Sequence, residues 1–146
     1  MEHEPAFVKA FLLSAKRARF AQFLAGPKRR KEMEERLLQL PFDPALATEI
    51  PGSQDFPQEL DKLLRARGAG PTCHLITCVL KADGREWPLR EALDLVCLQP
   101  SGAILSCLPG RLAYYKPPSP GAGVVLEAMA APGNRGQSAV RTRPGW

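Results

Sequence analysis

Cysteine, serine and histidine are the residues of this sequence with the most obvious capacity for chemistry. The chain has four cysteines and two histidines, and His74 follows Cys73 directly. A thiol or hydroxyl becomes a nucleophile when a nearby histidine accepts its proton and an acid orients that histidine. Cys107 or Ser106 with His74 and Asp83 would supply such a set. A small cysteine-dependent hydrolase, with Cys107 and His74 as catalytic residues, is therefore one hypothesis, although the residue types favour a protein that is not an enzyme.

The spacing of the cysteines does not fit a zinc site. The sequence has no C-x-x-C pair, and Cys73 and Cys78 would point to opposite faces of an extended strand. Each cysteine stands in an apolar run, where cysteine behaves as a small hydrophobic residue. Gly68-Ala69-Gly70 precedes a predicted strand, whereas phosphate-binding loops run from strand to helix. We expect reduced, buried thiols, no metal and no cofactor.

Basic residues concentrate near the two ends of the chain, whose net charge is +5. Residues 1–40 carry nine Lys and Arg against five Asp and Glu, and residues 101–146 carry five against one, whereas residues 41–100 carry six against nine. Such asymmetry favours an anionic partner. A nucleic-acid-associated protein is thus an alternative function, with Arg135, Arg141 and Arg143 as non-specific helpers. Its contact residues would be Lys16, Arg17, Arg19, Lys28, Arg29, Arg30 and Lys31, at the corner between two predicted helices.

The stretch Ala103–Tyr115 (AILSCLPGRLAYY) predicts a β-hairpin around Pro109-Gly110. With this pair at the centre, Leu105 lies opposite Tyr114 and Cys107 opposite Leu112. A pair of L-residues of this kind favours a type II turn, whose twist suits a tight hairpin poorly. We therefore expect a β-bulge.

Alternation along this hairpin assigns one face to the core and leaves a mixed face. The core face would carry Leu105, Cys107, Leu112 and Tyr114, which makes Cys107 structural. Ser106, Arg111 and Tyr115 alternate on the mixed face and offer a hydroxyl, a guanidinium and a phenol. They are the predicted ligand-binding residues, since a pocket needs only a few such polar groups.

The remaining elements are predicted from apolar periodicity and from turn residues. Helices are expected over residues 5–25 and 28–40, over about 55–68 with Asp55 as N-cap, and over 88–98. Strands are expected over residues 72–81, in the hairpin, and over 124–129 as an edge strand. Strand, helix and strand in succession imply a right-handed crossover and parallel pairing if the two strands are neighbours.

The expected fold class is α+β, with three N-terminal helices packed on a small mixed sheet of three or four strands that carries one crossover helix. Residues 1–129 would form a single globular domain. Residues 130–146 are rich in Gly, Pro, Arg and Ser without periodicity, which predicts a disordered tail.

No motif in the chain identifies a partner. The sequence has no apolar run of about 18 residues that could span a membrane. Its start, MEHEPAFVKAFLL, has acids where a signal peptide needs basic residues, which predicts a cytoplasmic protein without a membrane partner. The leading interpretation is a non-enzymatic binding or interaction module of unknown ligand, whose sheet edge could also pair copies into homo-oligomers.

Overall fold

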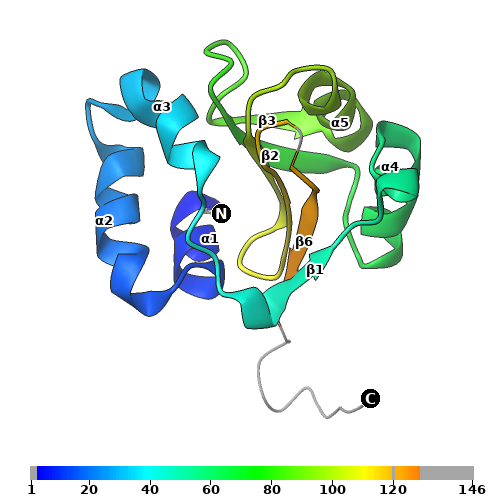
Figure 1. Ribbon diagram of the computed structural model, residues 1–146, viewed down its shortest axis with the longest axis horizontal. Coiled ribbons are helices and arrows are strands. Elements are labelled where there is room, and N and C mark those ends of the chain that lie inside the picture. Colours follow the sequence, from blue (N-terminus) through cyan, green and yellow to red (C-terminus); the bar gives the residue numbers. More distant parts are fainter. Residues whose placement is uncertain (1–2, 120, 129–146) are drawn as a thin grey trace.

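One antiparallel sheet separates two layers of helices (Figure 1). The computed structural model describes residues 3–119 and 121–128. Within them the strands lie in the order β1-β6-β5-β4-β2-β3. The strands are β1 (Ala47–Glu49), β2 (Thr72–Thr77), β3 (Arg85–Pro88), β4 (Ala103–Leu108), β5 (Leu112–Lys116) and β6 (Val124–Glu127).

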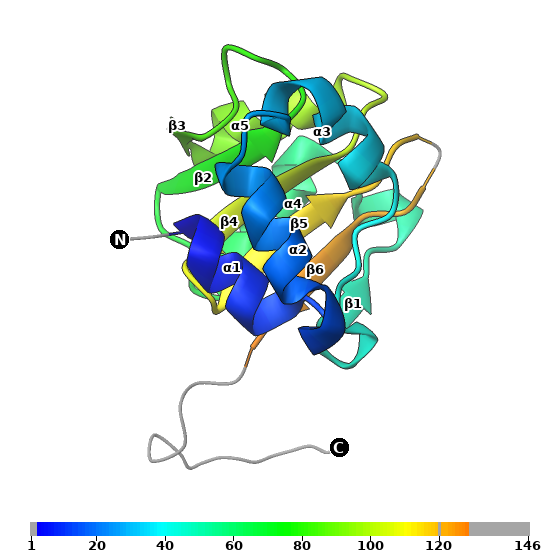
Figure 2. The same cartoon turned by 90° about the vertical axis from the view of Figure 1, so that its left-hand side faces the viewer.

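Helices cover both faces of this sheet. Figure 2 shows the first three in front of one face, and the other two lie behind it. They are α1 (His3–Phe11), α2 (Ser14–Ala25), α3 (Arg29–Leu38), α4 (Pro57–Ala66) and α5 (Leu89–Cys97), with short 3-10 turns η1 (Pro44–Leu46) and η2 (Gly52–Gln54). No helix in the described ranges is long and apolar enough to cross a membrane.

Each face of the sheet has its own hydrophobic core. Under α1–α3, the side chains of Phe7, Phe11, Met33 and Leu37 pack with Ile76, Ile104 and Tyr115. Under α4 and α5, those of Leu60, Leu64, Leu93 and Val96 pack with Leu75, Leu105 and Tyr114. The hairpin face predicted to be mixed is therefore a second core, because the N-terminal helices cover it.

The mixed α+β class is confirmed, but the details of the sheet are not. The described residues form a six-stranded sheet in which every pairing is antiparallel, and four helices rather than three precede β2. The expected strand 72–81 ends at Thr77, and the chain turns at Asp83-Gly84 into β3, which the prediction lacked. Because β3 reverses the chain before α5, neighbouring β2 and β4 run antiparallel, and the parallel crossover was wrong.

The helix expected over residues 5–25 is two helices. Between them, the N–H of Leu13 donates to the carbonyl of Pro41 at 2.9 Å, and the N–H of Asp43 donates to the carbonyl of Phe11 at 2.7 Å. A segment far along the chain thus takes backbone groups that would otherwise continue the helix, which periodicity cannot reveal.

The hairpin β4–β5 has the bulge that its turn residues predict. Leu105 lies opposite Tyr114, as expected, and the register shifts between Ser106 and Leu108. As a result Leu112 pairs with Leu108, and the expected pairing of Cys107 with Leu112 was wrong.

Asp55 has a different role from the expected N-cap. The N-cap position of α4 is Phe56, without a side-chain capping bond. The Asp55 carboxylate instead accepts hydrogen bonds from the Tyr114 hydroxyl at 2.7 Å and the Gly123 N–H at 3.0 Å. It thereby ties the start of α4 to β5 and to the segment before β6.

The strand expected over residues 124–129 is β6, but it is not an edge strand. It lies between β5 and β1, and the outer strands of the described sheet are β1 and β3. The predicted domain end at residue 129 and the tail predicted for 130–146, with its arginines, lie outside the described residues.

Replacement of Gly123 by Ala tests whether the contacts of Asp55 with Tyr114 and Gly123 stabilise the fold. An added Cβ would overlap the Tyr114 hydroxyl and lie 2.9 Å from Asp55 Oδ1, while nothing lies within 4 Å of one at Gly52. We expect Gly123→Ala to lower the free energy of unfolding by about 2 kcal/mol and Gly52→Ala to change it by less than about 0.5 kcal/mol. Urea denaturation measures the free energy of unfolding of both variants. Equal effects would contradict a stabilising role for the contacts of Asp55.

Candidate functional site

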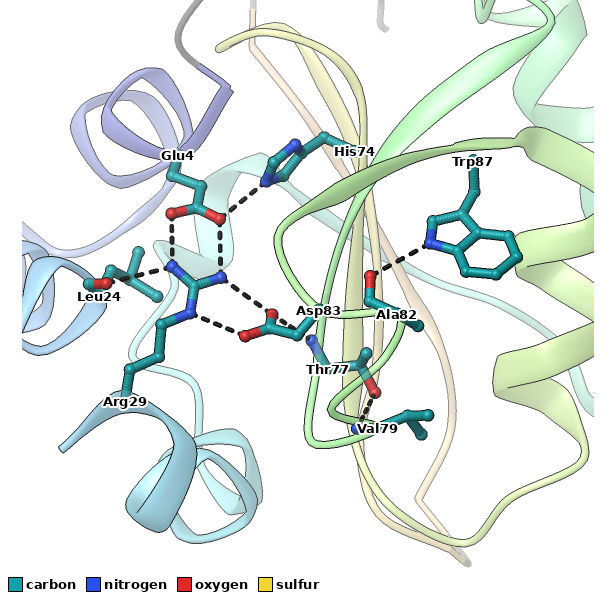
Figure 3. A network of polar contacts seen from close by, with 9 residues as sticks. All are labelled: Glu4, Leu24, Arg29, His74, Thr77, Val79, Ala82, Asp83 and Trp87. Carbon is teal, nitrogen blue, oxygen red and sulfur yellow. Dashed lines mark hydrogen bonds and ion pairs between the residues drawn. The ribbon is translucent and has the colours of Figure 1, made fainter. Parts of the chain in front are cut away.

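Arg29, the first residue of α3, lies between two carboxylates (Figure 3). Its guanidinium contacts Glu4 of α1 through bonds of 2.7 and 2.8 Å. It contacts Asp83, in the turn between β2 and β3, through bonds of 2.8 and 2.9 Å. One side chain thus joins α1, α3 and the β2–β3 turn.

All five N–H groups of this guanidinium have an acceptor. Nε donates to Asp83, Nη1 donates to Glu4 and to the Leu24 carbonyl, and Nη2 donates to both carboxylates. Since a guanidinium has five donors and accepts no hydrogen bond, Arg29 has none left for a ligand.

Local backbone features bring the partners of Arg29 into place. Gly26-Pro27 ends α2 and allows α3 to start beside α1. Asp83 also accepts a hydrogen bond from the Thr77 N–H at 3.1 Å, and Gly84 has the positive φ of 75° that the turn requires. The turn is therefore stabilised by its own hydrogen bond from Thr77 to Asp83 as well as by the contact with Arg29.

Two histidines extend the cluster across the sheet. His74 Nε2 donates to Glu4 at 2.7 Å, and His3 Nδ1 is hydrogen-bonded to the hydroxyl of Ser106 at 2.7 Å. The two imidazoles stack, with ring centroids 5.3 Å apart and planes 9° from parallel. We call these six residues the Arg29 cluster: His3, Glu4, Arg29, His74, Asp83 and Ser106.

The ionisation of the cluster is set by its contacts. Burial alone would raise the pKa of Glu4, but hydrogen bonds from Arg29 and His74 lower this pKa to about 2. Hydrogen bonds to the two carboxylates raise the pKa of Arg29. Burial, together with the neighbouring His74, lowers the pKa of His3. Glu4 is thus an anion and Arg29 a cation at neutral pH.

A cleft of about 440 Å³ opens beside the cluster, and we call it the α1 cleft. Its lining combines apolar residues with the two imidazoles, Glu4 and Arg29. Within the described residues, neither His3 Nε2 nor His74 Nδ1 has a hydrogen-bond partner. The apolar lining residues are Pro5, Val8, Ala21, Leu24 and Ala25.

The structure does not bring Cys107 and His74 together. His74 belongs to the α1 cleft, whereas Cys107 lies in the core under α4 and α5 and is 5% exposed. Its Sγ donates to the Leu105 carbonyl, and burial raises the pKa of the thiol. All four cysteines are free; burial also raises the pKa of Cys73 to about 12 and of Cys97 to about 11.

The three predicted ligand-binding residues lie apart. Ser106 is 1% exposed and contacts His3. The hydroxyl of Tyr115 donates to the Leu37 carbonyl at 2.7 Å, under α3. Arg111 is exposed at a separate hollow beside β1. No cavity among those found in the described residues is lined by all three.

The predicted nucleic-acid-binding residues divide into two groups. In the first group, the donors of Arg29 all bind acceptors within the fold, and Arg17 Nε donates to the Leu12 carbonyl at 3.0 Å. The other five are at the surface of α2 and around the start of α3: Lys16, Arg19, Lys28, Arg30 and Lys31.

Sequence reasoning missed Glu4 and His3 as members of a site. One signal was available for Glu4, because residues 5–31 contain no acid and Glu4 stands directly before that basic stretch. Among the described residues, no group of three or more His, Cys, Asp or Glu could hold a metal ion.

Comparison with known protein families, curated proteins and solved structures gives no match to this chain. Its function must therefore be inferred from its own geometry.

Replacement of Arg29 by Met should be strongly destabilising, because it leaves Glu4 and Asp83 half-buried without their cation. We expect a loss of about 3 kcal/mol in the free energy of unfolding. Arg30→Met removes the same charge at a neighbouring surface position and should cost less than about 0.5 kcal/mol. Chemical denaturation of both variants gives the comparison, and similar losses would show that Arg29 is an ordinary surface cation.

Glu4→Gln tests the charge of the cluster through pH. Because the pKa of Glu4 is about 2 in the fold and 4.5 as a model value, its charge stabilises the protein above pH 4.5, and this stability is lost as pH falls toward 2. We expect the stability advantage of the wild type over Glu4→Gln to shrink by about 2 kcal/mol between about pH 5.5 and 3. A difference that stays constant over this pH range would contradict the assignment.

Proposed function

We propose that this protein is a non-enzymatic binding module whose ligand occupies the α1 cleft. The observation that supports this most is the pair of stacked imidazoles in a cleft with apolar lining residues, since each ring has a nitrogen that lacks a partner in the described residues. An apolar cleft with a few polar groups in fixed positions is typical of small-molecule sites, and about 440 Å³ lies in their usual range.

The satisfied hydrogen bonds of the cluster indicate the ligand class. Arg29 has no free donor for an anion, and Glu4 already accepts three hydrogen bonds. An imidazole nitrogen, in contrast, donates or accepts according to its protonation. The cleft therefore suits a small molecule, or the side chain of a peptide, with an apolar body and a neutral hydrogen-bonding end.

The positions of the nucleophiles support binding rather than catalysis. The Ser106 hydroxyl has His3 as a neighbour but is 1% exposed, so a substrate in the cleft would not reach it. Cys107 lies under the opposite helices, where burial keeps its thiol protonated. Neither residue combines an accessible nucleophile with a base, which nucleophilic catalysis requires.

Three probes that share a benzene ring but carry a neutral, an anionic or a cationic polar group test the ligand class: phenol, benzoate and benzylamine. We expect phenol to bind with a dissociation constant on the order of 1 mM at neutral pH and to shift the amide NMR signals of α1 and α2 at the cleft. Benzoate and benzylamine should bind more weakly, since no unpaired charge faces them.

Ala21→Phe supplies the matched variant for this titration. Ala21 is exposed on α2 and lines the cleft, so a phenyl group there fills the cleft and should reduce phenol binding at least about tenfold. Ala66→Phe adds the same ring to the exposed end of α4 and should leave binding unchanged. Phenol shifts outside the cleft, or equal effects of the two variants, would contradict the proposed site.

A further inference from the structure

A groove lies between α2 and α3 and is lined by residues of both helices. Figure 2 shows these two helices in the layer in front of the sheet. The groove consists of two hollows of about 340 and 240 Å³, and both are lined by Arg19 and Arg36. Lys16 lies in the first hollow and Lys28 in the second, so cations line the groove along its length. We call this feature the α2–α3 groove.

Most cations of the groove have no carboxylate partner among the described residues. Residues 5–31 contain eight Lys and Arg and no Asp or Glu. Among the described residues, Lys16, Arg19 and Lys28 form no ion pair. On α4 and α5, by contrast, exposed cations pair with carboxylates one turn away, as in Lys62–Glu59, Arg65–Asp61 and Arg90–Asp94.

Two glutamates line the groove, but they do not cancel its charge. Glu32 pairs with Arg36 at 3.5 Å, and the Arg36 guanidinium lies 4.9 Å above the centre of the Phe23 ring. This pair is therefore internally balanced. Glu35 is the one remaining carboxylate of the described residues that line the two hollows, against Lys16, Arg19 and Lys28.

We propose that the α2–α3 groove binds the phosphate backbone of a nucleic acid. A row of unpaired cations along a groove matches the regular charge of a phosphate chain, and Gln22 and Gln39 add amide donors to the lining. An acidic peptide would also need an apolar anchor, but the aromatic rings of the groove, Phe20 and Phe23, are only 4% and 6% exposed. Backbone contacts of this kind carry no sequence preference.

This surface is separate from the α1 cleft, although both involve α2 and α3. Arg29 belongs to the cluster and takes no part in the groove, since its donors are all used. The two proposals can therefore fail independently.

Fluorescence anisotropy with a labelled thymidine oligomer of about 20 nucleotides tests the groove over about 50 to 200 mM salt. Neutralisation of three phosphates on a single strand, one each by Lys16, Arg19 and Lys28, predicts a slope of about −2 for log K against log salt. The triple variant Lys16→Gln, Arg19→Gln and Lys28→Gln should bind at least about tenfold more weakly, with a slope nearer zero by about 2.

The matched control carries the same charge change on the opposite layer: Lys62→Gln, Arg65→Gln and Arg90→Gln. It should bind within about threefold of the wild type, and thermal denaturation checks that both variants remain folded. Equal losses in the two variants, no binding of the wild type at low salt, or preferential binding of polyglutamate would each overturn the proposal. Amide shift mapping on the wild type, expected at residues 16–28, gives a readout that needs no variant.

Discussion

The bonds of Arg29 to two carboxylates are the interaction on which the N-terminal half depends. α1, α3 and the β2–β3 turn are far apart in sequence, and this guanidinium fixes their relative positions by two bidentate contacts. Removal of any one of these three side chains would leave a half-buried charge without an opposite charge beside it, which is strongly destabilising. The cluster thus adds directional polar contacts to the apolar packing of Phe7, Phe11 and Met33 in this layer.

That geometry separates the two proposed surfaces. Four residues of the cluster line the α1 cleft, and all the donors of Arg29 bind acceptors within the fold, so the cleft presents imidazoles rather than a free cation. In the α2–α3 groove, Lys16, Arg19 and Lys28 are exposed and form no ion pair with any residue that the structure describes. The basic stretch of residues 16–31 thus contains one arginine that is bound within the fold and several cations that are exposed. Composition alone does not distinguish the two kinds.

Features set by neighbouring residues could be predicted from the sequence, and features set by distant partners could not. Pro109-Gly110 predicted the bulge, and the apolar surroundings of Cys107 predicted a core thiol. The role of Arg29 depends on Glu4, 25 positions away, and on Asp83, 54 positions away. Asp55 does not cap α4 as expected, because its carboxylate accepts hydrogen bonds from Tyr114 and Gly123. The second core behind β4 had a local signal, since this strand has almost no polar residue and is covered on both faces.

The most direct test of the Arg29 cluster is the NMR spectrum of its guanidinium. When every N–H donates to a fixed acceptor, rotation about the Cζ–N bonds is restricted and exchange with water is slow. The hydrogen-bond network predicts separate, slowly exchanging Nη–H signals for Arg29 at neutral pH, unlike those of Arg30 at the surface. A single averaged Nη signal for Arg29, like that of a solvated arginine, would contradict it.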